Sequence, residues 1–157
     1  MPDLYLVAAQ PNPPGRDASR LGTTTNAKLN EEWVEFEALA ARNLSWDELS
    51  HLTFNGACQR TGQEAVFRFG AIQLLRGQRV RVHTGVGTAQ WVGNTLHVYA
   101  GRSWFVWNNV CGDRAFLSYN GSVIDSAYYD ARPPEGELVR QTGTNKFVPR
   151  YRSVSGW

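Results

Sequence analysis

The chain has 157 residues, of which 42% are hydrophobic and 19% charged, so it is long enough to bury one core without disulfide or metal support. Fifteen glycines, six Trp, six Tyr and seven Phe favour a turn-rich β protein over a helical bundle. No apolar run approaches the roughly 18 residues of a membrane span, and no basic region precedes the short apolar stretch at the N-terminus. We therefore expect a cytoplasmic protein, or part of an assembly built in the cytoplasm, without a membrane span.

The net charge of +2 is unevenly distributed along the chain. Residues 1–130 carry 11 Lys/Arg and 12 Asp/Glu, a net charge of −1, whereas residues 131–157 carry five basic and two acidic residues, a net charge of +3. Only the C-terminal segment, residues 131–157, therefore has an electrostatic preference for acidic partners. A solvated basic terminus without a partner is the alternative interpretation.

Three segments among the first 50 residues do not show the alternation of a half-buried strand. Leu4–Ala9 is short and apolar and predicts an edge strand, which the prolines at 11, 13 and 14 should end. From there to Leu29 the chain is polar, which predicts a long loop with no core face. Residues 38–50 contain Ala and Leu before a Ser45 cap, and they are the one helix candidate.

The rest of the chain shows the alternation of strands. Residues 32–38 alternate strictly, so one face should be buried and the other exposed. We expect the apolar face to hold Val34, Phe36 and Ala38, and the polar face Trp33, Glu35 and Glu37. Further strands are predicted at residues 52–54, 65–69, 72–75, 79–83, 96–99, 115–119 and 122–126. The Asn120-Gly121 pair between two of them is a strong hairpin signal, because both residues tolerate a positive φ. Strands at this spacing predict an antiparallel β-sandwich.

Three motifs resemble the lamin tail domain family, an immunoglobulin-like module that ends nuclear lamins and also occurs in bacterial proteins. They are N-E-E-W-V-E-F at 30–36, G-Q-R-V-R-V at 77–82 followed by G-V-G-T at 85–88, and V-W-N-N-V-C-G-D-R-A-F-L at 106–117. The hairpin sequence 120–126 completes the third motif. The similarity spans roughly residues 3–130, although the family's L-S-G-W is matched only by Leu49-Ser50-His51-Leu52, and Cys111 is an extra residue.

The resemblance implies an immunoglobulin-like sandwich domain at residues 1–130, with an edge strand and extended loop at 1–29 and a basic tail at 131–157. In the third motif we expect Trp107 to fill the space between two sheets. Asn108 and Asn109 should bond loop backbone, Gly112 should adopt a conformation other residues resist, and Asp113 should cap backbone N–H groups.

The sequence provides no arrangement typical of an enzyme, a metal site or a cofactor site. His51, His83 and His97 lie in separate segments, although the last two, on the outward face of their strands, can meet across a sheet. There is no nucleophile elbow, C-x-x-C, H-E-x-x-H or calcium loop. Whether Cys58 and Cys111 pair is left open by the sequence, and an inert or partly buried thiol is the expectation for Cys111. We therefore expect no enzyme activity, no cofactor and no metal.

The remaining signals point to binding. The resemblance implies a non-enzymatic module for protein–protein contacts, a subunit of a larger assembly or a self-associating scaffold. The alternative is a nucleic-acid-binding module, because basic and aromatic residues are interleaved near the C-terminus. The candidate binding residues are Trp91, Tyr99, Trp104, Arg140, Lys146, Arg150, Tyr151, Arg152 and Trp157. Since Pro133 and Pro134 should end the sandwich, we expect deletion of Arg140–Trp157 to leave it folded.

Overall fold

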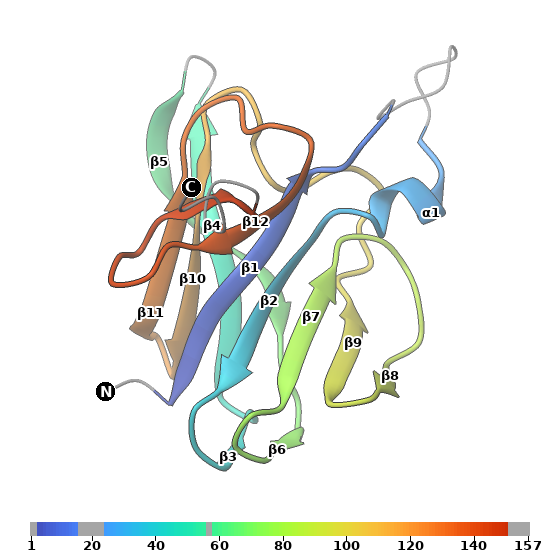
Figure 1. The fold of residues 1–157 in the computed structure, drawn as a ribbon, viewed down its shortest axis with the longest axis vertical. Coiled ribbons are helices and arrows are strands. Elements are labelled where there is room, and N and C mark those ends of the chain that lie inside the picture. Colours follow the sequence, from blue (N-terminus) through green and yellow to red (C-terminus); the bar gives the residue numbers. More distant parts are fainter. Residues whose placement is uncertain (1–2, 16–23, 56–57, 151–157) are drawn as a thin grey trace, which may run out of the picture.

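The computed structural model describes residues 3–15, 24–55 and 58–150, and these form an all-β sandwich of two main sheets. Figure 1 shows β1, β2, β7 and β9 side by side in one layer, with β4, β5, β10 and β11 in the layer behind them. The antiparallel β-sandwich predicted from the sequence is therefore confirmed. No helix among the described residues has the length and apolar character needed to cross a membrane.

The larger sheet has seven strands in the order β13-β12-β1-β2-β7-β9-β8, and all neighbours are antiparallel except β7 and β9. Its strands are β1 (Leu4–Asn12), β2 (Trp33–Ala38), β7 (Arg79–His83), β8 (Gln90–Val92), β9 (Thr95–Tyr99), β12 (Gly136–Arg140) and β13 (Phe147–Pro149). Since parallel strands need a connection that crosses back along the sheet, the chain between β7 and β9 makes that return and contributes β8 at the edge.

The smaller sheet has four strands in the order β11-β10-β4-β5, and a third sheet pairs only β3 with β6. These strands are β3 (Arg42–Asn43), β4 (Asp47–Asn55), β5 (Gln59–Arg68), β6 (Gln73–Leu74), β10 (Asp113–Tyr119) and β11 (Ser122–Tyr129). The predicted hairpin is confirmed, because Tyr119 pairs with Ser122 across a two-residue turn in which Asn120 has φ 47° and Gly121 φ 86°.

The core lies between the two main sheets. Leu6, Phe36 and Val80 of the larger sheet are fully buried, as are Leu49 and Leu117 of the smaller one. Val34, Phe36 and Ala38 are buried together, as the alternation predicted. Trp107 is also buried in this cluster and fills the space between the sheets, which confirms its expected role.

Three predictions for the first 50 residues are wrong. Leu4–Ala9 is not an edge strand: β1 continues to Asn12 and lies between β12 and β2. Pro11 is tolerated because the register with β12 shifts between Ala9 and Asn12, so no ladder bond needs its missing N–H. The predicted helix at 38–50 is instead occupied by β3 and the start of β4, since tertiary pairing outweighs the propensity of Ala and Leu. The loop before Leu29 contains the four-residue helix α1 (Asn26–Leu29), and its last residue does reach the core.

The sandwich does not end at residue 130. After the Pro133-Pro134 turn, β12 pairs with β1 and β13 pairs with β12, so the C-terminal segment adds two strands to the larger sheet. Leu138 and Phe147 are buried in the common core. The expectation that these prolines would terminate the fold is wrong, because a proline pair ends a strand but allows the chain to return along the same sheet.

Cys58 and Cys111 form a disulfide, with a Cα–Cα distance of 5.5 Å. Cys58 immediately precedes β5, and Cys111 lies in the loop before β10. The expectation of an inert thiol at Cys111 is therefore wrong. The extra residue in the W-N-N motif is the one that joins this loop covalently to the β4–β5 hairpin.

Candidate functional site

The crossover loop, residues 100–112, connects β9 of the larger sheet to β10 of the smaller one and closes one end of the core. Its start is fixed by backbone bonds, among them Arg102 N–H donating to the carbonyl of Thr84 at 2.9 Å. Its middle is fixed by the buried Glu32, whose Oε1 accepts from Val106 N–H at 2.8 Å and from the Thr84 hydroxyl at 2.5 Å. A long loop without regular structure is uncommon in a compact domain and is often functional.

The end of the crossover loop is organised by Asp113 and Asn108. Asn108 Oδ1 accepts from the backbone N–H groups of Val110 and Cys111, both at 2.9 Å, and Asp113 Oδ2 accepts from Asn108 N–H at 3.1 Å. The structural roles expected of Asn108 and Asp113 are confirmed. Gly112 has φ 73°, and a Cβ there would lie 2.5 Å from the Tyr129 carbonyl oxygen, so only glycine fits. The expected role of Asn109 is not observed, because among the described residues its Oδ1 has no hydrogen-bond partner.

Asp113 also orients His51. The carboxylate is fully buried, and its Oδ2 lies 2.9 Å from His51 Nδ1, while Oδ1 accepts from the N–H groups of Leu52 at 3.2 Å and Arg114 at 2.8 Å. A carboxylate oxygen accepts, so Nδ1 donates in this bond, and in that tautomer Nε2 is an acceptor. The imidazole also packs edge-to-face on Trp107, with ring centroids 5.5 Å apart.

His51 faces a cavity of about 310 Å³ at this end of the sandwich, which we call the end cavity. Its lining combines strand residues with the crossover loop: His51 of β4, Glu64 of β5, and Arg102, Ser103, Trp104, Phe105 and Val106. Arg102 is held in place by donating to the Ala65 carbonyl at 2.7 Å, and its Nη1 lies 3.8 Å from Glu64 Oε1. Charged, hydroxyl and aromatic groups therefore converge here.

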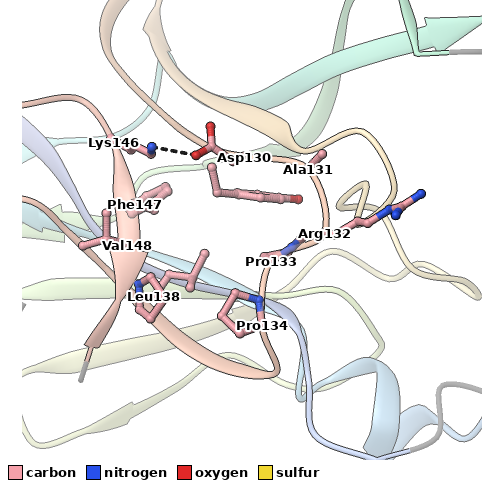
Figure 2. Close-up of a pocket in the computed structure, with 11 residues that line it drawn as sticks. Asp130, Ala131, Arg132, Pro133, Pro134, Leu138, Lys146, Phe147 and Val148 are labelled. Atoms are coloured by element: carbon pink, nitrogen blue, oxygen red, sulfur yellow. Dashed lines mark ion pairs between the residues drawn. The ribbon is translucent and has the colours of Figure 1, made fainter. Parts of the chain in front are cut away.

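A larger hollow of about 440 Å³, the C-terminal groove, lies between residues 130–134 and β13. Figure 2 shows the side chains of Pro133, Pro134, Phe147 and Val148 around it, with the Lys146–Asp130 ion pair on one side. Arg132 points away from these residues. The groove is the larger of the two hollows, but Lys146 and Asp130 on its lining are paired with each other and Arg132 points away (Figure 2). We therefore take the end cavity as the candidate site.

The predicted aromatic site residues have different surroundings. Trp104 is 51% exposed on the lining of the end cavity, and Trp91 is 43% exposed on the edge strand β8. Tyr99 is half-buried, stacked on His83 with ring centroids 4.9 Å apart, so it is part of the outer sheet surface. Of these three described aromatic residues, only Trp104 lines the candidate site.

The three predicted basic site residues that the structure describes are paired with carboxylates. Arg140 is buried between the sheets against Asp125, Lys146 pairs with Asp130 at 2.6 Å, and Arg150 pairs with Glu137 at 2.8 Å. Tyr151, Arg152 and Trp157 lie outside the described residues. Arg140 is therefore not an exposed binding residue in this structure, because its side chain is 9% exposed and pairs with Asp125 within the fold.

The outward-facing strand residues form a covered surface on the larger sheet. Trp33 and Glu35 were expected to be exposed but are buried, because Arg81 lies 3.7 Å over the Trp33 ring and donates to Glu35 at 2.9 Å. Next to them, His83 Nε2 lies 2.7 Å from His97 Nδ1, so the predicted meeting of the two histidines is confirmed. His83 Nδ1 lies 2.7 Å from the Asn30 carbonyl oxygen, so Nδ1 donates there and Nε2 accepts from His97.

We expect this histidine pair to make stability fall with acidification. Burial lowers the pKa of His83, and burial together with the nearby Arg81 lowers the pKa of His97 from the ordinary 6.5, with Glu35 opposing in part. Below about pH 6.5 the unfolded chain therefore binds more protons than the folded one, and stability is lost as pH falls further. Thermal melts between about pH 7.5 and 5 should show this loss, and His83→Gln should reduce it. An unchanged pH slope in His83→Gln would contradict this assignment.

Sequence reasoning missed a second exposed aromatic group, at the β10–β11 turn. Trp46 is 67% exposed and Tyr119 44% exposed, and the Asn120 N–H donates to the Trp46 carbonyl at 2.9 Å. The Arg42 guanidinium lies 5.1 Å over the Tyr119 ring. We call Arg42, Trp46 and Tyr119 the hairpin-end patch. A tryptophan between Ser45 and Asp47, outside any alternating run, was the available signal.

No protein-family model matches the chain, and no curated protein matches it. In the described part of the chain, no group of three or more His, Cys, Asp or Glu side chains is arranged to hold a metal ion. The two features that indicate a function are therefore the hairpin-end patch and the end cavity.

Proposed function

We propose that this chain is a non-enzymatic binding module that makes protein–protein contacts, with a second copy of the chain as its first candidate partner. The observation that carries the proposal is the exposure of Trp46, at 67%, on a framework of paired strands. Trp, Tyr and Arg are the residue types that most often dominate the energy of protein interfaces, and the hairpin-end patch contains one of each.

Hydrogen bonds within the chain fix the position of Arg42 in the patch before any partner binds. Arg42 donates to Asp47 Oδ1 at 2.8 Å and to Asp3 Oδ2 at 3.2 Å, so its position over Tyr119 is fixed from two sides. A side chain that is already ordered loses little conformational entropy when a partner binds. Such preorganisation supports an interface at the hairpin-end patch.

Sedimentation velocity over the micromolar to submillimolar range tests the proposal. We expect concentration-dependent self-association that Trp46→Ala weakens at least about tenfold, a typical loss at an interface anchor. Trp91→Ala removes an equally large exposed ring from another edge and should leave the association unchanged. A protein that stays monomeric at all concentrations and in an extract of its source cells would refute the proposal.

Membership of the lamin tail domain family remains part of this proposal, supported by the W-N-N and G-D motif and by the sandwich it organises. The nucleic-acid alternative has less support, because Arg140, Lys146 and Arg150 already pair with carboxylates. A gel shift at low salt separates the two.

The disulfide indicates the redox compartment in which the module functions. Thiols in the cytosol are kept reduced, whereas disulfides persist in oxidising compartments. Because Cys58 and Cys111 are paired, we propose an oxidising environment in place of the cytoplasm expected from the sequence.

A further inference from the structure

We propose that the end cavity binds a neutral polyhydroxylated ligand, a single sugar unit whose ring packs on Trp104. This assigns a ligand site that is independent of self-association through the hairpin-end patch. The proposal follows from the size, the charge balance and the hydrogen-bonding groups of the cavity.

Size and charge restrict the ligand. The cavity of about 310 Å³ lies at the small end of the range of ligand pockets, which spans about 300–1,000 Å³, so it suits one ring and not an extended molecule. Among the described lining residues, one basic and one acidic side chain occur, Arg102 and Glu64, and they face each other at 3.8 Å. Their charges cancel, so an anionic ligand would meet Glu64 and a cationic one would meet Arg102, and a neutral ligand is favoured.

The polar groups match hydroxyls. The separation of 3.8 Å between Arg102 Nη1 and Glu64 Oε1 exceeds a direct hydrogen bond, so a bridging hydroxyl can accept from one and donate to the other. His51, whose Nδ1 is engaged by the buried Asp113, offers Nε2 as an acceptor. The Ser103 hydroxyl can donate and accept. Adjacent hydroxyls on a sugar ring are groups that donate and accept together.

The aromatic wall supplies the apolar contact. Trp104 is 51% exposed and packs edge-to-face with Phe105, with ring centroids 5.8 Å apart. A tryptophan provides a large, rigid apolar face, and one face of a sugar ring consists largely of C–H groups that can pack on it. The crossover loop that carries Trp104 is fixed by Glu32 and by the disulfide, so the wall is preformed.

Saturation-transfer difference NMR with glucose, galactose, mannose and N-acetylglucosamine tests the proposal. We expect saturable binding of at least one sugar in the millimolar range, weakened at least tenfold by Trp104→Ala and by Glu64→Ala. Trp91→Ala is the matched control and should bind like the parent protein. Melting curves of each variant show that it is folded.

Three results would overturn the proposal. They are the absence of saturable binding by any of the four sugars, binding that Trp104→Ala leaves unchanged, and tighter binding of glucuronate or glucosamine than of the neutral sugars. Since the self-association measurement uses Trp46→Ala, failure of one proposal is distinguishable from failure of the other.

Discussion

Replacement of Arg140 by alanine should lower the free energy of unfolding by about 3–5 kcal/mol, the usual cost of removing one partner of a buried ion pair. Arg140 of β12 donates to both carboxylate oxygens of Asp125 on β11, at 2.7 and 3.2 Å, and the two side chains are each 9% exposed. Asp125 Oδ2 also accepts from the Leu6 N–H at 2.8 Å, and the guanidinium lies 4.1 Å over the Tyr5 ring. Alanine at 140 would leave a buried carboxylate without its cation. Urea unfolding monitored by tryptophan fluorescence measures the change.

Arg150→Ala is the matched control for this prediction. Arg150 also makes two hydrogen bonds to one carboxylate, that of Glu137, but its side chain is 59% exposed. Exposed pairs contribute about 0–1 kcal/mol, so this variant should remain close to the parent protein. If Arg140→Ala lowers the free energy of unfolding no more than Arg150→Ala does, the Arg140–Asp125 ion pair does not stabilise the contact between the two sheets.

The same ion pair changes the expectation for truncation. From the sequence, deletion of Arg140–Trp157 should leave the sandwich folded. The structure places Arg140 between the sheets and buries Phe147, so this deletion should instead abolish cooperative unfolding. A truncated chain with a sharp melting transition near that of the full chain would show that β13 contributes little.

The alternating segments could be predicted from the sequence because one buried face fixes their period. Residues 79–83 and the Asn120-Gly121 hairpin were located correctly for that reason. The order of the strands in the sheet could not be predicted in the same way. The short apolar stretch of β1 predicts an edge strand, but β1 is paired on both sides. Alternation gives the faces of a strand but contains no information about which strands lie beside it.

The candidate site was less predictable for a related reason. The sequence indicates Trp104 as one of several aromatic residues that one core need not absorb. His51, Glu64 and Asp113, in contrast, come together only through the pairing of β4 with β5 and β10. His51 is directly opposite Glu64 in that register, although 13 positions separate them in sequence. The basic residues near the C-terminus predict a binding surface, but Arg140, Lys146 and Arg150 pair with carboxylates of the same chain. Charge along a sequence does not show which side chains find partners inside the fold.

We expect reduction of the Cys58–Cys111 disulfide to lower the free energy of unfolding by about 4 kcal/mol. The bond joins residues 53 positions apart, and opening a loop of this length raises the entropy of the unfolded chain. Urea unfolding with and without dithiothreitol measures the loss. The urea m-value should rise as well, because the reduced unfolded chain exposes more surface.

The double variant Cys58→Ser/Cys111→Ser provides the reference, and it should match the reduced parent protein and be insensitive to dithiothreitol. Because Glu32 and Asp113 hold the crossover loop by hydrogen bonds that do not depend on the disulfide, the reduced protein should retain the sandwich at low urea. The crossover loop and the sandwich of the reduced protein should then unfold together, in a single transition with a lower urea midpoint than that of the oxidised protein. If the oxidised and reduced proteins unfold at the same urea concentration, the link between the β4–β5 hairpin and the crossover loop does not constrain the unfolded chain.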